Sequence, residues 1–327
     1  MAELATSYMG LNLKNPIIVS SSSLTNNLNG IKNCENAGAG AVVLKSLFEE
    51  QITTELASIE KDEHLGVHPE AADYIRQLGM DMRADQYLEL VEQAKNEVKI
   101  PIIASLNCIS NSCWIDFAKS IENAGADAIE LNIALMPRDF FVEPHEIEDQ
   151  VVEIFSSVRK MVKVPIAVKI GPYFTSVPKI AERLQIAGAD ALVLFNRFYR
   201  PDVDIENIEM IPGYRYSTPE EIALSLRWIG ILSRQMKLDL AGSTGVFDGA
   251  GVIKHLLAGA KATMICSTLF INGFKQIHIM LDRVQFWMDT HGYASVNDFR
   301  GILSTKGNQK PAYFERLQYI KALVGIE

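Results

Sequence analysis

The sequence predicts a single (β/α)8 barrel, and three observations carry this prediction. Four segments repeat the pattern Ala-Gly-Ala followed by a short apolar run, at residues 37–46, 124–133, 187–196 and 258–267. Four further short apolar runs lie between these repeats, and helix-like spacing of apolar residues occupies most of the gaps. Apolar strands separated by helices imply a parallel sheet buried on both faces, and eight such strands imply a closed barrel. A doubly wound open sheet is the alternative, and it would usually contain fewer repeats.

Each repeat is typical of a helix end, a glycine cap and a strand. Three of the other apolar runs begin with proline, which suits the first residue of a strand. In the gaps, apolar residues at positions 180, 184 and 187, and at 114, 117, 118 and 121, fall on one face of a helix. We therefore expect strands at residues 16–21, 41–46, 101–106, 127–133, 165–170, 190–196, 238–243 and 262–268.

Three connections are longer than a barrel needs: residues 47–80 after strand 2, 134–150 after strand 4 and 197–219 after strand 6. Long loops at the catalytic face of a barrel usually cover or shape a ligand. No Gly/Ser-rich linker or low-complexity tract divides the chain. Residues 1–327 are therefore interpreted as one domain.

The composition excludes several classes of protein. Of the 327 residues, 48% are hydrophobic, which rules out an intrinsically disordered chain. The net charge of −9 argues against a nucleic-acid or anionic-membrane binder. The chain starts without a secretory signal and has no apolar stretch long enough to span a membrane. Its four cysteines form no CxxC pair, so we expect reduced thiols, a cytoplasmic location and no metal site.

Polar residues recur where the expected strands end, which is the catalytic rim of a barrel. A lone lysine there could be a solvated terminus, whereas lysines and asparagines on four strands are harder to dismiss. Polar groups that converge on one cavity would be costly without a ligand or water. The set is Ser20, Ser21, Lys45, Ser46, Ser105, Glu130, Asn132, Lys169, Asn196, Ser243, Thr244, Gly245, Ser267 and Thr268.

The last two strands predict a phosphate site. The segment Gly242-Ser-Thr-Gly245 follows strand 7, and Ser267-Thr268 follows strand 8. The loops after these two strands form the common phosphate site of barrels, and glycine lets the backbone approach a phosphate closely. A plain tight turn is the alternative for either loop alone. Phosphate at this end and a cationic, amide-rich cavity toward strands 2–6 fit flavin mononucleotide (FMN), with lysine stabilising the charge that develops on reduction.

At these residues the chain resembles dihydroorotate dehydrogenases, nearest the soluble class 1 type, over almost its whole length. The matching motifs are Asn15-Pro-Ile-Ile-Val-Ser-Ser-Ser22, Val43-Leu-Lys-Ser46, Glu130-Leu-Asn132, Pro165-Ile-Ala-Val-Lys-Ile-Gly-Pro-Tyr-Phe174, Ser243-Thr-Gly-Val246, His255-Leu-Leu-Ala-Gly-Ala260 and Ser267-Thr268. The resemblance implies that Ser20, Ser21, Lys45, Ser46, Asn132, Lys169, Ser243, Thr244, Gly245, Ser267 and Thr268 contact FMN. It also implies that Asn132 and Asn196 face the substrate and that the protein is a homodimer.

One departure from the family concerns the catalytic base. The family continues Glu-Leu-Asn with Leu-Ser-Cys-Pro-Asn, in which cysteine is the base, whereas Leu135 stands at that position here. Leucine cannot accept the proton that dihydroorotate loses while hydride passes to the flavin. Other residues could act as the base in place of cysteine, but each is a weak candidate: Cys113, Ser112, Cys108, Glu49, Glu50, His64 and His68. For each of them, packing, capping or a solvated surface is the simpler interpretation. Arg197, and less specifically Arg138 and Arg200, could bind a substrate carboxylate or be a surface charge.

The leading hypothesis is an FMN-dependent oxidoreductase that transfers hydride between a CH–CH bond of a small molecule and the flavin, with dihydroorotate as the default substrate. One alternative is a related FMN enzyme for another cyclic or carboxylated molecule, and another is a flavin-binding homologue that has lost catalysis. A third is a flavin-free aldolase that uses Lys169 as a Schiff-base amine. The substrate and the electron acceptor stay open, as does the identity of the base.

Overall fold

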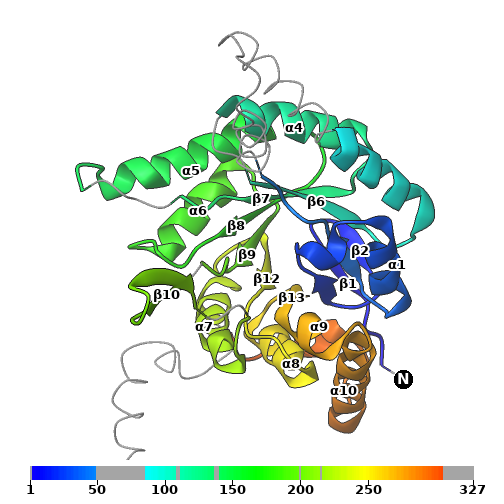
Figure 1. Ribbon diagram of the computed structural model, residues 1–327. Helices are drawn as coiled ribbons and strands as arrows, with labels where there is room; N and C mark the ends of the chain where they lie inside the picture. Colours follow the sequence, from blue (N-terminus) through cyan, green and yellow to red (C-terminus); the bar gives the residue numbers. More distant parts are fainter. Residues whose placement is uncertain are drawn as a thin grey trace, which may run out of the picture.

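The structure is a computed structural model that describes residues 2–48, 85–107, 111–135, 140–198, 200–213 and 216–304. Within these ranges a parallel sheet of eight principal strands forms the centre of the molecule, as predicted (Figure 1). The strands are β3 (Ile17–Val19), β4 (Ala41–Val43), β6 (Ile102–Asn107), β7 (Ala128–Asn132), β8 (Ile166–Ile170), β9 (Ala191–Leu194), β12 (Asp239–Gly242) and β13 (Ala262–Ile265).

The sheet closes on itself. Its order runs β4-β3-β13-β12-β9-β8-β7-β6, and β4 also pairs with β6 through Val42↔Ile102 and Val43↔Ile103. The first and last members of the series are therefore neighbours, and the barrel has no free edge. The (β/α)8 prediction is confirmed, and the open-sheet alternative is wrong. Most strands end one to three residues earlier than expected, because the polar residues that follow them leave the hydrogen-bonded ladder.

Helices surround this barrel (Figure 1). Each turns an apolar face inward, as the periodicity predicts; Ile180 and Leu184 of α6, for example, are fully buried. The four repeat glycines at positions 38, 125, 188 and 259 all have positive φ, from 90° to 117°, as a helix end of this type requires. The helices are α1 (Leu28–Asn36), one that includes residues 85–97, α4 (Asn111–Asn123), α5 (Pro144–Arg159), α6 (Val177–Ala187), α7 (Ile222–Leu232), α8 (Gly249–Ala258), α9 (Ser267–Asn272), α10 (Gln276–His291) and α11 (Val296–Phe299).

An N-terminal hairpin closes the end of the barrel where the strands begin. It consists of β1 (Thr6–Tyr8) and β2 (Leu11–Leu13) in antiparallel pairing. Tyr8 is fully buried against the small and apolar residues that fill the barrel interior. The backbone N–H of Met9 donates to Oδ2 of Asp239, the first residue of β12, at 2.9 Å. The sequence analysis did not predict this hairpin, because three-residue strands are too short to show a period.

The long connection after β9 also contains a hairpin, formed by β10 (Pro201–Asp204) and β11 (Glu209–Pro212), which stands out beside the barrel (Figure 1). Its apolar side chains Val203, Ile205, Ile208 and Met210 are exposed. The short strand β5 (Leu47–Phe48) begins the connection after β4, and most of the rest of that connection lies outside the described residues.

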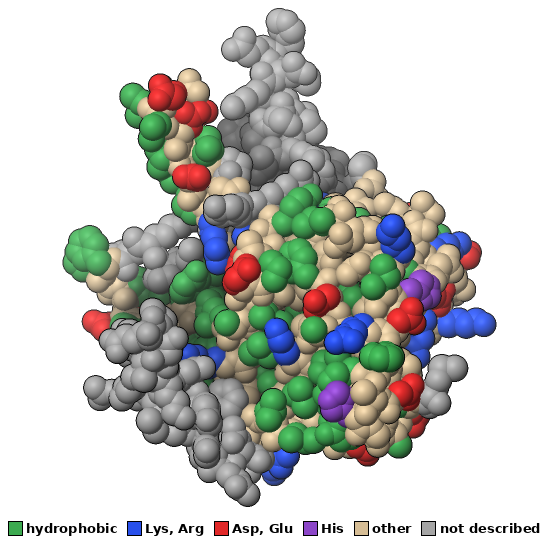
Figure 2. All heavy atoms as spheres, turned by 90° about the horizontal axis from the view of Figure 1, so that it is seen from below, with side chains coloured by type: hydrophobic (Ala, Val, Ile, Leu, Met, Phe, Trp, Pro, Cys, Tyr) green, Lys and Arg blue, Asp and Glu red, His purple; other side chains and the backbone are tan. Residues whose placement is uncertain are grey.

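The face that lies below α7–α10 in Figure 1 carries Lys, Arg, Asp and Glu side chains interspersed with hydrophobic ones (Figure 2). No helix in the described part of the chain combines the length and apolar character that crossing a bilayer requires.

Candidate active site

A cavity of about 250 Å³ opens at the end of the barrel where the strands finish. Five strands or the turns that follow them contribute to its wall, which explains why the polar strand ends meet there. The lining residues are Ser20, Ser21, Lys169, Phe195, Asn196, Arg197, Ser217, Ser243, Thr244, Gly245, Val246, Met264, Cys266 and Ser267. The sequence analysis had selected nine of these positions, and it missed Phe195, Ser217, Val246, Met264 and Cys266.

Lys169 supplies the positive charge of this cavity from strand β8. Its side chain is 10% exposed, and its Nζ lies 3.6 Å from Oε1 of Glu130, whose side chain is 1% exposed. Neither carboxylate oxygen of Glu130 accepts a hydrogen bond from a described residue. The Lys169 ammonium therefore compensates the negative charge of the Glu130 carboxylate, which is buried inside the barrel. Lys169 also lines the cavity.

Two asparagines form an amide pair at the same rim. Asn132 ends β7 and Asn196 follows β9, and the Nδ2 of Asn196 donates to Oδ1 of Asn132 at 2.8 Å. Register places Asn132 directly beside Lys169 on the neighbouring strand. The structure thus brings together the two asparagines and the lysine that the sequence placed on strands 4, 5 and 6.

The turn after β12 has the features of an anion cradle. Thr244 and Gly245 both have positive φ, of 73° and 77°. The backbone N–H groups of Thr244, Gly245 and Val246 donate no hydrogen bond to a described residue, although Gly245 and Val246 are buried. A side chain at Gly245 would lie 2.2 Å from the backbone nitrogen of Ile222, so only glycine fits there. Consecutive free N–H groups in such a turn form a site that suits a phosphate.

A buried histidine supports this turn. His255 of α8 is fully buried, and its Nε2 lies 2.8 Å from the Oγ of Ser225 on α7. A Cβ on Gly242 would lie 2.5 Å from the Nδ1 of His255, so the imidazole packs directly against the last residue of β12. Burial lowers the pKa of His255 to about 3, which keeps the ring neutral.

This depressed pKa predicts a pH-dependent stability. In the unfolded chain the imidazole takes up a proton near its ordinary pKa of about 6.5, whereas in the folded protein it stays neutral until the pH approaches 3. Its contribution to folding is therefore present above pH 6.5 and is lost as the pH falls toward 3. We expect the wild type to lose about 2 kcal/mol more than His255→Gln between pH 7 and pH 5.

Urea unfolding at the two pH values measures this difference. His145→Gln is the matched control, because His145 is exposed on α5. An identical loss of stability in the wild type and in His255→Gln would show that His255 is not the group responsible.

The side chains of the residues after β13 form hydrogen bonds within the protein that the sequence did not suggest. The Oγ of Ser267 accepts hydrogen bonds from the N–H and the hydroxyl of Ser217, both at 3.0 Å. Thr268 is fully buried, and its hydroxyl donates to the carbonyl of Phe247 at 2.9 Å. This hydroxyl ties α9 to the turn before α8, and a contact between Thr268 and a cofactor stays a prediction.

Lys45 is not among the residues that line the cavity of Lys169. The Oγ of Ser46, the next residue, lies 3.0 Å from that of Ser21 and 2.8 Å from that of Ser105. Lys45 and Ser46 both line a separate cavity with Asn26 and Glu89, between the start of α1 and the helix that includes residues 85–97. A contact between Lys45 and FMN stays a prediction.

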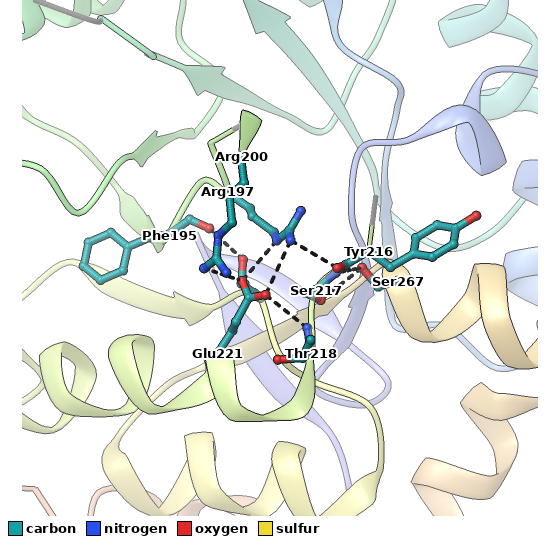
Figure 3. Close-up of polar contacts among 9 residues, drawn as sticks. Phe195, Arg197, Arg200, Tyr216, Ser217, Thr218, Glu221 and Ser267 are labelled. Carbon is teal, nitrogen blue, oxygen red and sulfur yellow. Dashed lines mark hydrogen bonds and ion pairs between the residues drawn. The ribbon is translucent and has the colours of Figure 1, made fainter. Parts of the chain in front are cut away.

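Arg197 and Arg200 converge on one glutamate (Figure 3). The Nε of Arg197 lies 3.0 Å from Oε2 of Glu221, and Arg200 reaches the same oxygen at 3.2 Å. Arg197 also donates to the carbonyl of Tyr216 at 3.1 Å, and Glu221 accepts from the N–H of Thr218 at 3.1 Å. This network joins the loop after β9 to the start of α7. The guanidinium of Arg197 thus has partners within the protein. A role for Arg197 in substrate binding stays a prediction.

The position of the family's base lies in apolar surroundings. Leu135 is half-buried and lines a cavity of about 250 Å³ together with Val142, Tyr173, Phe174 and Phe198. The same cavity is also lined by Glu148, whose carboxylate is paired with Arg183 at 3.6 Å. The side chains of the weak substitutes Ser112 and Cys113 lie outside the described residues, as do Cys108, Glu49, Glu50, His64, His68 and Arg138.

The comparison with known protein families decides the classification. A sequence model of dihydroorotate dehydrogenases matches residues 3–288. The chain belongs to the dihydroorotate dehydrogenase family. It is accordingly an oxidoreductase that acts on a CH–CH bond.

Curated members of the dihydroorotate dehydrogenase family match over most of this chain. The catalytic subunit of dihydroorotate dehydrogenase B (NAD(+)) from Thermoplasma acidophilum is 25% identical, covering 92% of this chain and 99% of its own length. A putative dihydroorotate dehydrogenase A (fumarate) from Aeropyrum pernix is 24% identical, covering 91% of this chain and 97% of its own length. The chloroplastic dihydropyrimidine dehydrogenase (NADP(+)) of Arabidopsis thaliana is 20% identical over 91% of this chain and 76% of its own. The names of these relatives differ in the electron acceptor.

Proposed function

We propose that this protein is an FMN-dependent oxidoreductase that interconverts a dihydropyrimidine and the corresponding pyrimidine, with dihydroorotate and orotate as the default pair. One observation carries the proposal beyond family membership. The turn at residues 244–246, whose N–H groups donate to no described residue, lines the same cavity as Lys169 and Asn196, and Asn196 donates to Asn132. A phosphate cradle and a cationic, amide-lined wall are what FMN requires.

The residues present fit FMN. The N–H groups of Thr244, Gly245 and Val246 would hold its phosphate, because none of them donates to a described residue and because Gly245 and Val246 are buried residues. Lys169 would face the part of the flavin that becomes negative on reduction. When bound, FMN supplies the hydride acceptor, which no amino-acid side chain can provide.

The chain itself binds and orients the substrate. The Asn132–Asn196 pair offers the donors and acceptors that a pyrimidine ring carries on its edge. The Nζ of Lys169 is paired with the buried Glu130 at 3.6 Å, which argues against the Schiff-base alternative, since that chemistry needs an amine free to attack a carbonyl. The side chain at position 135 contributes no proton acceptor.

Leu135 favours a second candidate function, in which the enzyme serves a related substrate better than dihydroorotate. The cavity beside Leu135 is mostly apolar but contains the Glu148 carboxylate, so it would accept a ring without the carboxylate of dihydroorotate. The flavin site and the direction of hydride transfer would be the same in both cases. The homodimer, the cytoplasmic location and the single-domain organisation of residues 1–327 stay predictions.

An absorption spectrum of the purified protein tests the cofactor, and anaerobic titration tests the substrate. We expect a yellow protein that releases FMN on denaturation. Bleaching by dihydroorotate supports the default pair, whereas bleaching by dihydrouracil alone supports the second candidate. A colourless protein that takes up no added FMN would contradict both.

A further inference from the structure

A second polar cavity lies at the opposite end of the barrel, where strands β12 and β13 begin. Its volume is about 250 Å³. Its wall comes from the end of α7 and the residues before β12, from the segment between α8 and β13, and from the turn at Arg300-Gly301. Because β12 runs from this cavity at Asp239 to the phosphate cradle after Gly242, the two sites are on opposite faces of the barrel.

Positive charge dominates the wall of this cavity. Arg234, Lys237, Lys261 and Arg300 line it, and Asp239 is the carboxylate among the lining residues. This excess is notable in a chain whose net charge is −9. Cations that gather in a hollow of an acidic protein repel one another, so their arrangement is favourable only when an anion joins them.

Asp239 neutralises only part of this positive charge. Its Oδ2 accepts from the N–H of Met9 at 2.9 Å, and its Oδ1 lies 3.8 Å from the Nζ of Lys261. The nearby carboxylate of Asp190 is paired with Arg159 at 3.1 Å and also accepts from the N–H of Ile166. One carboxylate among four cations leaves the cavity with a net positive charge.

Arg300 is a half-buried cation of this cavity. Its side chain makes no hydrogen bond and no ion pair within 4 Å in the described part of the chain, although the charge of Asp239 acts on it at longer range. Burial lowers the pKa of its guanidinium more than Asp239 raises it. Arg234 lies beside it and donates to the carbonyl of Gly301 at 3.2 Å, which leaves further donors on its guanidinium.

We propose that this cavity binds a phosphate group, either as the free ion or as the head of a small phosphate monoester. Two guanidinium groups can each bind a tetrahedral oxyanion through a pair of N–H donors, and two ammonium groups add charge. The volume lies below the roughly 300–1,000 Å³ of pockets that enclose drug-sized ligands, so a phosphate fits and a whole nucleotide does not. The proposal does not depend on the flavin chemistry at the other end of the barrel.

Calorimetric titration of the full-length, FMN-loaded protein with inorganic phosphate, at constant ionic strength, tests the proposal. Loading with FMN occupies the cradle at residues 244–246, so the binding measured is not at that site. We expect one saturable site per chain. Arg300→Gln should weaken it at least tenfold, and Lys237→Gln, which alters an exposed side chain, should weaken it several-fold without affecting folding.

Lys254→Gln is the matched control, because it removes one positive charge from an exposed position on α8 outside the cavity. It should leave phosphate binding unchanged. Methyl phosphate as a second titrant separates the two sources: tighter binding than phosphate identifies a monoester, and weaker binding identifies the free ion. No saturable binding, or equal weakening in Lys254→Gln and in the two cavity variants, would overturn the proposal.

Discussion

Leu135→Cys is expected to accelerate anaerobic reduction of the flavin by dihydroorotate by about 10²–10⁴-fold relative to the wild type, the range that a positioned general base contributes. Leu135 stands where the family carries its catalytic cysteine, three residues after Asn132. The described side chains around it include one carboxylate, that of Glu148, which is paired with Arg183 at 3.6 Å. A thiol at position 135 would supply the missing acceptor. Stopped-flow absorbance of the flavin measures the rate.

Leu135→Ala is the matched control, because it removes the same bulk without adding a proton acceptor. It should leave the rate within a few-fold of the wild type. If Leu135→Cys and Leu135→Ala are equally slow, the residue at this position does not limit the reaction. If the wild type already reduces its flavin as fast as Leu135→Cys, another group of this chain acts as the base.

Lys169→Met is expected to lower the free energy of unfolding by about 3–5 kcal/mol at pH 7, the range for removing one partner of a buried ion pair. The reason is the isolation of Glu130, whose side chain is 1% exposed and whose nearest described cation is the Lys169 ammonium at 3.6 Å. The same substitution should slow flavin reduction, because it removes the positive charge of the cavity. Urea unfolding of the FMN-free protein separates the stability effect from cofactor binding.

The double variant Glu130→Gln/Lys169→Met distinguishes the ion pair from simple packing. It replaces both charges by neutral groups of similar size, so it should recover much of the lost stability, although it should not restore flavin reduction. A double variant as unstable as Lys169→Met alone would mean that the lysine stabilises the barrel through contacts other than Glu130.

Much of the fold could be predicted because its signals are local. The repeated Ala-Gly-Ala segments mark helix ends by a backbone requirement, and the glycines at positions 38, 125, 188 and 259 indeed have positive φ. The apolar runs mark strands by burial on both faces, and all eight occur. The β1–β2 hairpin escaped prediction, since the reason for its position is the open barrel end that Tyr8 fills.

The candidate site was predicted less evenly. The sequence predicted which polar residues lie side by side where the strand itself sets the direction of the side chain, as for Asn132 and Lys169. One step past the strands, the structure shows contacts that the sequence did not predict: Lys45 lines a separate cavity, and the Thr268 hydroxyl donates to the carbonyl of Phe247. Cys266 was also missed, although it lines the cavity and burial raises the pKa of its thiol. Glu221 gave no signal, because its importance comes from two arginines that the chain brings together across the loop after β9.

By itself, then, the sequence determined the closed barrel, the rim at which the chemistry lies and the turn that suits a phosphate, since periodicity and glycine positions act through the backbone. Only the tertiary structure decided which polar side chains face one another. Ser46 forms hydrogen bonds with Ser21 and Ser105 from two other strands, and it lines the same separate cavity as Lys45. Lys169 is held over a buried Glu130, and four cations meet at the far end of β12. Such contacts join residues distant in the chain, and no local pattern encodes them.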